Sequence, residues 1–461
     1  MNTTRRGLSA VLATLLLASG AGPASRAGER TNVRGLGMAG SSVASSRGLD
    51  AVGINPANLA LPDDGTVTLS LVPVGVGVGS DFMTLGLYNK FFTGVESPTG
   101  RIARNLSESD KQELIDAFPG GIGRIGADAE VRPIGLAIRF GKFATFAVTA
   151  TERVAATAAI PASYAKFLLE GMTPGSSYDF SGATGSAAWT REYALSAGFA
   201  LPSVPWFMSW SGGVSVKLIH GFAYASVTRD NTWLAAGTDG VLDGNIDIAG
   251  VTSHSNLAGS PFPSPAGSGI GVDIGLSAKL NDYAIAGLSV TDVGSMHWDG
   301  DVREMYGQGR MHLDDPTNSA QRDSLEHAVT GNTRQGGAFT VGLPTTLRMG
   351  VQFELENIHM LKKLLYGEMT AECDYRQGFS DFPGSSRVGI LSAGLEYRPW
   401  QFFPIRTGVG FGGADHFNFA LGFGLKLWML QIDVASDNIG WLFSHDTFSR
   451  GSLGVGLTLK M

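Results

Sequence analysis

The sequence lacks features that would place it among soluble disulfide-rich proteins, nucleic-acid-binding proteins or helical membrane proteins. It has one cysteine, Cys373, which excludes an internal disulfide framework and a cysteine-based metal site. Charged residues make up only 16% of the chain, against a usual share of about 25%. After the first 27 residues no stretch reaches the ~18 apolar residues that a membrane helix needs. The net charge of −7 gives no case for nucleic acid as a partner.

What the chain has instead is glycine, 64 residues of it, and hydrophobicity that alternates with a period of two. A strand places successive side chains on opposite faces, so alternation gives one apolar face and one small or polar face. The end of the chain is the clearest case, with Leu453, Val455, Leu457, Leu459 and Met461 on one face. In a membrane barrel the apolar face meets lipid and the other face lines the lumen. The same pattern recurs at residues 134–140, 193–199, 270–280, 347–355 and 417–427.

The connections between these strands predict their number. Six look like short turns and seven look like loops, most of them long, for example after Thr151, Phe222 and Val293; they alternate strictly and join fourteen strands. Short turns on one rim and long loops on the other are typical of outer-membrane barrels, with both termini on the periplasmic side. Residues 66–92 hold one strand or two. Aromatic residues expected at the membrane interfaces are Trp189, Tyr193, Trp206, Trp210, Tyr397, Trp400 and Trp428.

The start of the chain predicts export. Arg5 and Arg6 precede an apolar run from Leu8 to Leu17, and Ser25-Arg26-Ala27 is a small-x-small cleavage site. Residues 1–27 therefore form a signal peptide, because the apolar core is too short for a retained anchor helix. Export and alternation together predict an all-β transmembrane antiparallel barrel in the outer membrane of a Gram-negative-type envelope.

Two loops are expected to carry helices, at residues 107–118 and 163–172. The first has Ser109 and Gln112 at capping-box spacing. Both helices have apolar stripes although they belong on an exposed rim. They either pack on each other or on the barrel mouth, or they collect a hydrophobic ligand. In the second interpretation the ligand-binding residues are Leu114, Phe118, Tyr164, Phe167, Leu168 and Met172.

Charged side chains on the expected lumen face of consecutive strands form a possible ladder. Opposite charges on neighbouring strands stabilise a barrel wall and can hold a plug by hydrogen bonds; the alternative is a selective constriction. No nucleophile–base constellation accompanies them, and the histidines lack metal-ligand spacing, so we predict no enzyme activity, no cofactor and no metal. The lumen charges are Arg348, Glu354, Glu372, Asp374, Arg376, Glu396, Arg398 and Arg406.

Residues 35–40 match the dinucleotide-binding pattern GxGxxG. That pattern works only between a strand and a helix of a βαβ unit, whereas here it follows the signal peptide. Glycine that allows tight backbone packing is the better interpretation.

The same region carries a more specific resemblance. The stretch RGLGMAG at 34–40, then NPANLA at 55–60, between a signal peptide and a barrel, resembles the N-terminal hatch of the long-chain fatty-acid transporter (FadL-type) superfamily, which includes PorV-like proteins. Residues 287–294, 342–350, 394–399 and 404–408 are similar to motifs of an uncharacterised branch of it. The resemblance implies a fourteen-stranded barrel at 66–461 and a hatch at 28–65 inside its lumen. The hatch residues are Gly35, Gly37, Gly40, Asn55, Pro56 and Ala57; the Asn55–Pro56 pair is a hinge or latch, or simply a folded turn.

By resemblance, the expected function is passage of small hydrophobic molecules, such as fatty acids, across the outer membrane. The expected partners are outer-membrane lipid, a hydrophobic ligand and the assembly machinery, which should accept the apolar Met461 in place of the usual aromatic terminus; the protein is expected to be a monomer. The alternative is a PorV-like scaffold that binds envelope or secreted proteins through its loops, which the polar stretch 312–335 fits better. A general porin is a third possibility, which a hatch would weaken.

Overall fold

The computed structural model describes residues 29–461 except 99, 257–262, 315–318, 320, 322, 324–329, 362–365, 381, 414–416, 443–445 and 447. The expected signal peptide, His416 and part of the 312–335 stretch lie outside the described residues.

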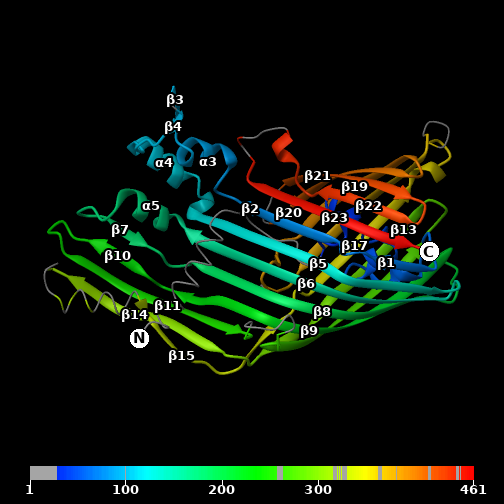
Figure 1. Ribbon diagram of the computed structural model, residues 1–461, viewed down its shortest axis with the longest axis horizontal. Helices are drawn as coiled ribbons and strands as arrows, with labels where there is room; N and C mark the ends of the chain where they lie inside the picture. The colour runs from blue at the N-terminus through cyan, green and yellow to red at the C-terminus, as the bar shows by residue number, and fades with distance from the viewer. Residues whose placement is uncertain are drawn as a thin grey trace.

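Fourteen antiparallel strands close into a barrel, as the pattern of turns and loops predicts (Figure 1). The first is formed by β1 and β2 together, and both pair with β5 on one side and with β23 on the other, which closes the ring. The eighth is formed by β16 and β17, which both pair with β13. The barrel strands are β1 (Val67–Ser70), β2 (Val74–Ser80), β5 (Ile122–Phe140), β6 (Ala144–Pro161), β8 (Thr184–Ala200), β9 (Ser209–Asp230), β12 (Gly267–Lys279), β13 (Ala284–Trp298), β16 (Phe339–Gly342), β17 (Thr346–Glu354), β18 (Glu368–Gly378), β19 (Ile390–Trp400), β20 (Phe403–Gly412), β21 (Phe417–Leu427), β22 (Leu430–Ser436) and β23 (Arg450–Lys460).

The outer face of the wall is apolar around the ring. Leu195 is 59% exposed, Ile270 64% and Leu453 51%, although each lies within a paired strand. The residues that alternate with outward ones point inward and are small or polar: on β9, Ser215 and Lys217 are fully buried on either side of the exposed Val216. A wall with an apolar outer face and a polar inner face is typical of a transmembrane barrel. No helix among the described residues is long and apolar enough to cross a bilayer.

Several strands run further than the sequence predicts. The loops expected after Thr151, Phe222 and Val293 begin later, because β6 continues to Pro161, β9 to Asp230 and β13 to Trp298. The extra residues keep their ladder partners: Ile160 pairs with Gly123, and Ala156 with Ala187. In β6 the run Ala155-Ala156-Thr157-Ala158-Ala159 hid the extension, since such small residues carry little apolar–polar contrast.

The extended strands support a further sheet beyond the barrel. Strand β9 pairs with β12 up to Gly221 and with β11 from Ala223 onward. Strand β11 pairs in turn with β14, and β14 with β15, so the wall branches at this point. The additional strands, which the sequence did not predict, are β7 (Ser177–Asp179), β10 (Trp233–Ala236), β11 (Leu242–His254), β14 (Arg303–Leu313) and β15 (Asn332–Gln335), with the separate hairpin β3 (Val95–Ser97) and β4 (Gly100–Ile102).

Three short helices lie at the same end of the molecule as this added sheet, and the C-terminus lies at the opposite end (Figure 1). The expected capping box at Ser109 and Gln112 is wrong: Ser107 is the N-cap and exchanges hydrogen bonds with Asp110. The helix at 85–92 was not predicted; Thr84 caps it. The helices are α3 (Leu85–Phe92), α4 (Glu108–Asp116) and α5 (Ala162–Glu170), with the 3₁₀ turns η3 (Pro119–Gly121), η4 (Leu355–Asn357) and η6 (Gly440–Leu442).

Residues 29–61, here called the N-terminal segment, lie inside the ring of strands (Figure 1). The segment contains α2 (Val33–Leu36), η1 (Gly48–Ala51) and η2 (Pro56–Ala60). Its apolar side chains pack on small inward residues of the wall: Leu49, Ala51, Val52 and Leu59 against Ala137, Ala147 and Ala194, and Val33 and Leu36 against Ala435.

Candidate functional site

The candidate site is the junction between the N-terminal segment and the inner face of the barrel. Wall glycines bring strand backbone close to segment backbone: a Cβ on Gly213 would lie 2.2 Å from the carbonyl carbon of Pro56, and one on Gly408 2.4 Å from that of Met38. A Cβ on Gly37 of the segment would lie 3.0 Å from the Cα of Gly422 on β21. Glycine is therefore needed on both sides of the junction, because a side chain would displace the segment.

Two carboxylates of β18 hold four successive backbone amides of the segment. The amides of Ser42 and Val43 donate to Asp374 Oδ2 at 2.6 and 2.9 Å. The amides of Ala44 and Ser45 donate to Glu372 Oε1 at 2.6 and 3.2 Å. Both carboxylates are buried. We call this arrangement the amide latch, in which each of two side-chain oxygens accepts hydrogen bonds from two successive backbone amides.

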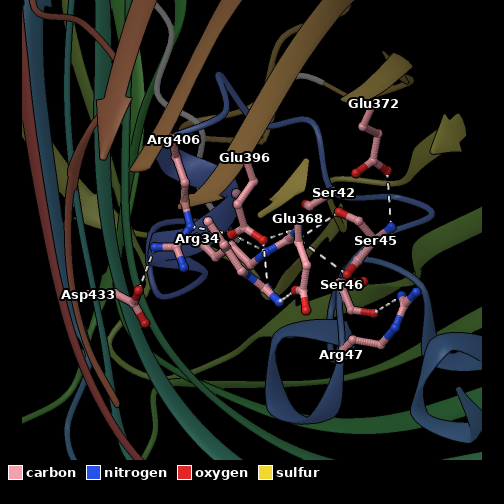
Figure 2. A network of polar contacts seen from close by, with 12 residues as sticks. Arg34, Ser42, Ser45, Ser46, Arg47, Glu368, Glu372, Glu396, Arg406 and Asp433 are labelled. Atoms are coloured by element: carbon pink, nitrogen blue, oxygen red, sulfur yellow. Dashed lines mark hydrogen bonds and ion pairs between the residues drawn. The ribbon is translucent and has the colours of Figure 1, made fainter. Parts of the chain in front are cut away.

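Beside the latch, Arg34 of the segment enters a chain of alternating charges on the wall (Figure 2). Arg34 Nε lies 2.9 Å from Glu396 Oε2, and its NH1 donates to Ser45 Oγ at 2.6 Å. Arg406 also binds Glu396, at 2.6 Å, and binds Asp433 at 2.5 Å. Arg398 completes the chain with bonds to Glu396 and Glu368.

The first residues of the segment are anchored by buried ion pairs. Arg30, fully buried, binds Asp128 of β5 at 2.6 Å and Asp437 at 2.8 Å. Glu29 binds Arg348 and Arg376, and Thr31 Oγ1 donates to Glu130 at 2.6 Å. The contacts of Arg30 and Thr31 tie the segment to the wall on either side of the barrel closure, and those of Glu29 tie it to β17 and β18.

The Asn55–Pro56–Ala57 stretch turns against β9 and β12. Asn55 caps η2 by accepting from the Ala57 amide at 3.2 Å, and its Nδ2 donates to the carbonyls of Val43 and Leu276. Ser211 Oγ donates to the Ala57 carbonyl at 3.0 Å. A side chain that joins the segment to itself and to the wall fits a latch, but it is equally a well-satisfied turn.

Of the expected lumen charges, the structure brings Arg348, Glu372, Asp374, Glu396 and Arg406 into the buried junction. Arg376 binds Glu29, and Arg398 lies at the margin with Glu368. Glu354 stays near the short-turn rim, beside Asn357.

A second charged network was missed from the sequence. Lys217 of β9, fully buried, binds Asp292 at 2.6 Å and Asp273 at 2.9 Å, with Glu192 at 3.7 Å. Arg153 joins it through Glu192 at 2.9 Å. One signal was available in the sequence. The alternation of residues along β9 places Lys217 on the inward face, where it is a single charge among small residues.

The expected ligand residues on the loop helices are divided. Leu114 is buried, and Phe118 stacks on Phe82 with ring centroids 4.3 Å apart. Leu168 is 78% exposed, and Met172 is half-buried just past the helix end. Helix α4 lies against α5, as the packing interpretation expects.

The aromatic residues of α5 belong to a small cluster with β7 and the chain after it. Tyr164 and Phe167 pack against Phe180, and Phe167 also meets Tyr178. The Tyr164 hydroxyl lies 3.3 Å from Asp230; burial and that carboxylate raise the pKa of Tyr164. The aromatic side chains that were expected to bind a ligand thus pack mostly against one another.

The inner wall is apolar toward the end of the barrel that carries the added sheet. Buried residues from four or more strands and loops form what we call the mouth cluster: Ala188, Ile219, Tyr224, Ala266, Met296, Trp298, Leu343 and Phe382. A small cavity of about 30 Å³ separates part of this cluster from Arg153, Glu192 and Asp292 below it.

A larger apolar cavity lies at the level of the strand extensions. It measures about 150 Å³ and is lined by small residues of β5, β6, β8, β9, β11 and β14, among them Ile125, Ala156, Ala187, Ala225, Val251 and Met305. Ala156, Ala187 and Ala225 are direct cross-strand partners, so they share one face of the sheet. No group of three or more metal-ligating side chains occurs among the described residues.

Residues 56–437 match the model of a family of unknown function, DUF5723. The chain belongs to this family. A comparison with curated proteins gives no match. Membership in DUF5723 fits the sequence resemblance to an uncharacterised branch of the FadL-type superfamily.

Among solved structures, the barrel is similar to the Ralstonia pickettii toluene transporter TbuX, with 13% identity over 97% of this chain and 100% of that chain, at a TM-score of 0.48. It is similar to the P. putida toluene transporter TodX, with 12% identity over 96% and 99%, at a TM-score of 0.43. A Pseudomonas aeruginosa FadL homologue gives 15% identity over 95% and 98%, at a TM-score of 0.42. The neighbours are of the FadL type, as the sequence resemblance predicts; likeness at this level assigns no activity to this DUF5723 protein.

Proposed function

We propose that this protein passes small hydrophobic molecules across the outer membrane, with residues 28–65 acting as a hatch in the lumen. The observation that carries the proposal is the mouth cluster: the outer end of the lumen is lined by aromatic and aliphatic side chains. A water-filled porin has a polar lumen, so this lining favours apolar cargo.

The way in which the N-terminal segment is held supports a moving hatch. Much of its attachment to the wall consists of hydrogen bonds and ion pairs, including the amide latch and the Arg34 and Arg30 contacts. Such contacts can be exchanged for water or for other partners one at a time, whereas a covalent link or a large apolar core resists stepwise release. We propose Asn55 and Pro56 as the point about which the segment turns.

The larger cavity is the place where we expect a ligand to bind first. Preformed ligand sites are concave and mostly apolar, and a dry apolar cavity of this size holds a compact apolar molecule. The loop helices then serve as its cover, and Phe118 and Phe167 line the approach.

The test is mass spectrometry of small molecules extracted from protein purified in mild detergent. We expect a stoichiometric hydrophobic compound in the wild-type protein. It should be lost in Ala225→Phe, which fills the cavity, and retained in Ala223→Phe, a change on the same face of β9 outside the lining. Phe118→Asp and Phe167→Asp should reduce it.

Three outcomes separate this proposal from its alternatives. Repeatedly empty, folded preparations that co-purify with another envelope protein would favour a scaffold. Steady ion conductance of the wild-type protein in planar bilayers would indicate an open porin. A bound compound that persists equally in both alanine variants would place its site elsewhere in the barrel.

A further inference from the structure

Helix α3 presents an apolar face that nothing in the described part of the chain covers. Leu85, Tyr88 and Phe92 are 36%, 49% and 56% exposed. Their spacing places all three on one side of the helix, and the rings of Tyr88 and Phe92 stack with centroids 5.8 Å apart. Phe91, on another side of the helix, is buried. The exposed side of α3 is therefore more apolar than the contacts of the helix with the rest of the protein require.

The strand register shows on which side of the wall the first loop packs. Val78 is one of the exposed valines on the outer face of β2, and it pairs with Ala127 of β5. Gly123 lies four residues before Ala127 in an unbroken ladder, so it shares this outer face. A Cβ on Gly123 would meet the rings of Phe82 and Phe118. Both rings therefore pack on the outer side of the wall.

These two rings fix the position of the loop helices. Phe82 lies just before α3 and Phe118 just after α4, and the rings stack with centroids 4.3 Å apart. The amide of Leu85 donates to the carbonyl of Phe448, which lies just before β23, at 2.7 Å. Figure 1 shows α3 directly beyond the end of β2. Helix α3 thus begins on the outer side of the wall, next to the strand residues that face lipid.

Helix α4, in the same loop, has a different surface. It exposes only polar and charged side chains, those of Glu108, Ser109, Gln112, Glu113 and Asp116. Helix α3 has no acidic residue, and its one charged side chain, Lys90, lies opposite the apolar face and binds Glu113 at 2.6 Å. A basic residue on one side and leucine and aromatic residues on the other are typical of helices that lie in a membrane interface. Tyrosine is also enriched there.

We infer that α3 lies in the interface of the membrane leaflet nearest the loop helices, with Leu85, Tyr88 and Phe92 inserted into lipid. Lipid is the partner because the apolar face of α3 continues the outer face of β2 after one short connection. Lys90 then faces α4, which meets water. The inference does not rest on the proposed transport, because this face would meet lipid whatever the barrel carries.

Spin-label accessibility of the whole protein in phospholipid vesicles tests this inference. In a Cys373→Ala background, Tyr88→Cys and Phe92→Cys each carry one label. Lipid around a label raises its collisions with oxygen and lowers those with a water-soluble nickel chelate, whereas contact with protein lowers both. We expect both labels to behave like one at the lipid-facing Val76→Cys, with nickel collisions several-fold lower and oxygen collisions higher than at Gln112→Cys.

Gln112→Cys is the matched control, because it places the same label on an exposed polar position of the neighbouring helix α4. Nickel collisions at residues 88 and 92 equal to those of this control would put α3 in water and overturn the inference. Low collisions with both reagents would indicate contact with protein, such as a second copy of the chain, and would overturn it too. Since two positions report on the same face, a folding defect in one variant leaves the other as the test.

Discussion

At the residue scale, glycine decides how closely the segment and the wall can approach. Gly213 and Gly408 have no unusual backbone angles; what matters is that backbone of the segment lies where their side chains would be. In the sequence, these two glycines cannot be distinguished from the other glycines of a glycine-rich strand. Their role becomes visible only when the segment is in place.

Gly213→Ala should therefore loosen the segment without harming the barrel. The added methyl group meets the Pro56 carbonyl carbon, and overpacking of this kind costs about 1–3 kcal/mol. We expect amides of η2 to exchange faster by at least fivefold. Gly342→Ala, at a wall position with open space around its Cβ, should leave that exchange unchanged; equal effects of the two changes would mean that the clash is relieved elsewhere.

In the added sheet, one cross-strand pair makes the stability of strand pairing depend on pH. His312 of β14 lies opposite Asp243 of β11, with Nδ1 2.7 Å from Oδ1. The hydrogen bond to that carboxylate and its negative charge raise the pKa of His312 above 6.5. Because the folded-state pKa is raised, the pair supports strand pairing fully below pH 6.5 and loses this support as pH rises through the raised value.

NMR titration of the histidine ring checks this directly. In the wild-type protein the His312 resonance should move at a pH above 6.5, and in Asp243→Asn it should return toward that value. A midpoint that does not respond to Asp243→Asn would show that the pair is not formed in solution.

At the element scale, the N-terminal segment has little regular secondary structure of its own. It contains one four-residue helix and two 3₁₀ turns, and such short pieces have little stability of their own. Wall carboxylates and arginines supply the partners that its backbone and side chains need. We therefore expect docking of the segment and closure of the lumen to be lost together.

Arg30→Gln tests that coupling. It removes the cation that binds Asp128 and one of the cations that bind Asp437, which keeps its contact with Arg450 at 3.3 Å. Breaking one side of a buried pair costs about 3–5 kcal/mol, so the segment should undock in a fraction of molecules and raise single-channel conductance above that of the wild type.

The matched control is Arg334→Gln, which removes a solvent-exposed pair with Glu304; pairs of this kind contribute little to stability. It should leave conductance at the wild-type level. A silent Arg30→Gln variant would show that the latch and the Arg34 contacts hold the segment unaided.

At the scale of the whole molecule, the barrel is stable only if its outer face stays apolar where lipid surrounds it. Leu195, in the middle of β8 and 59% exposed, is a lipid-facing position by this argument. Leu195→Arg should lower the free energy of unfolding by about 2–4 kcal/mol, and Phe143→Arg at a turn by about 0–1 kcal/mol. Reversible denaturant unfolding in lipid vesicles measures both, and equal costs would contradict the placement of the membrane.

Much of this architecture follows from local pattern. Period-two alternation predicts which faces of the strands meet lipid, and the succession of turns and loops predicts fourteen strands, which the closed ring confirms. Both are one-dimensional signals, because strand phase and turn chemistry depend on neighbouring residues.

Errors arose where the local contrast fades. The end of β6 is rich in alanine and the end of β9 mixes alanine with polar residues, so neither shows a clear apolar–polar alternation, and the extensions and the added sheet were missed. The capping box was placed two residues late because Ser107 and Ser109 both offer a hydroxyl, and only the course of the chain selects Ser107.

The sequence by itself thus determined a barrel whose outer face is apolar and meets lipid and whose inner face is small or polar. It also identified several inward charges, including Glu372, Asp374 and Glu396. Only the tertiary structure decided what those charges do, since their partners are hundreds of residues away: Arg34 for Glu396, and the amides of 42–45 for Glu372 and Asp374. Charge complementarity of this kind depends on distance in space, and closure of the ring is what brings the two ends of the chain together.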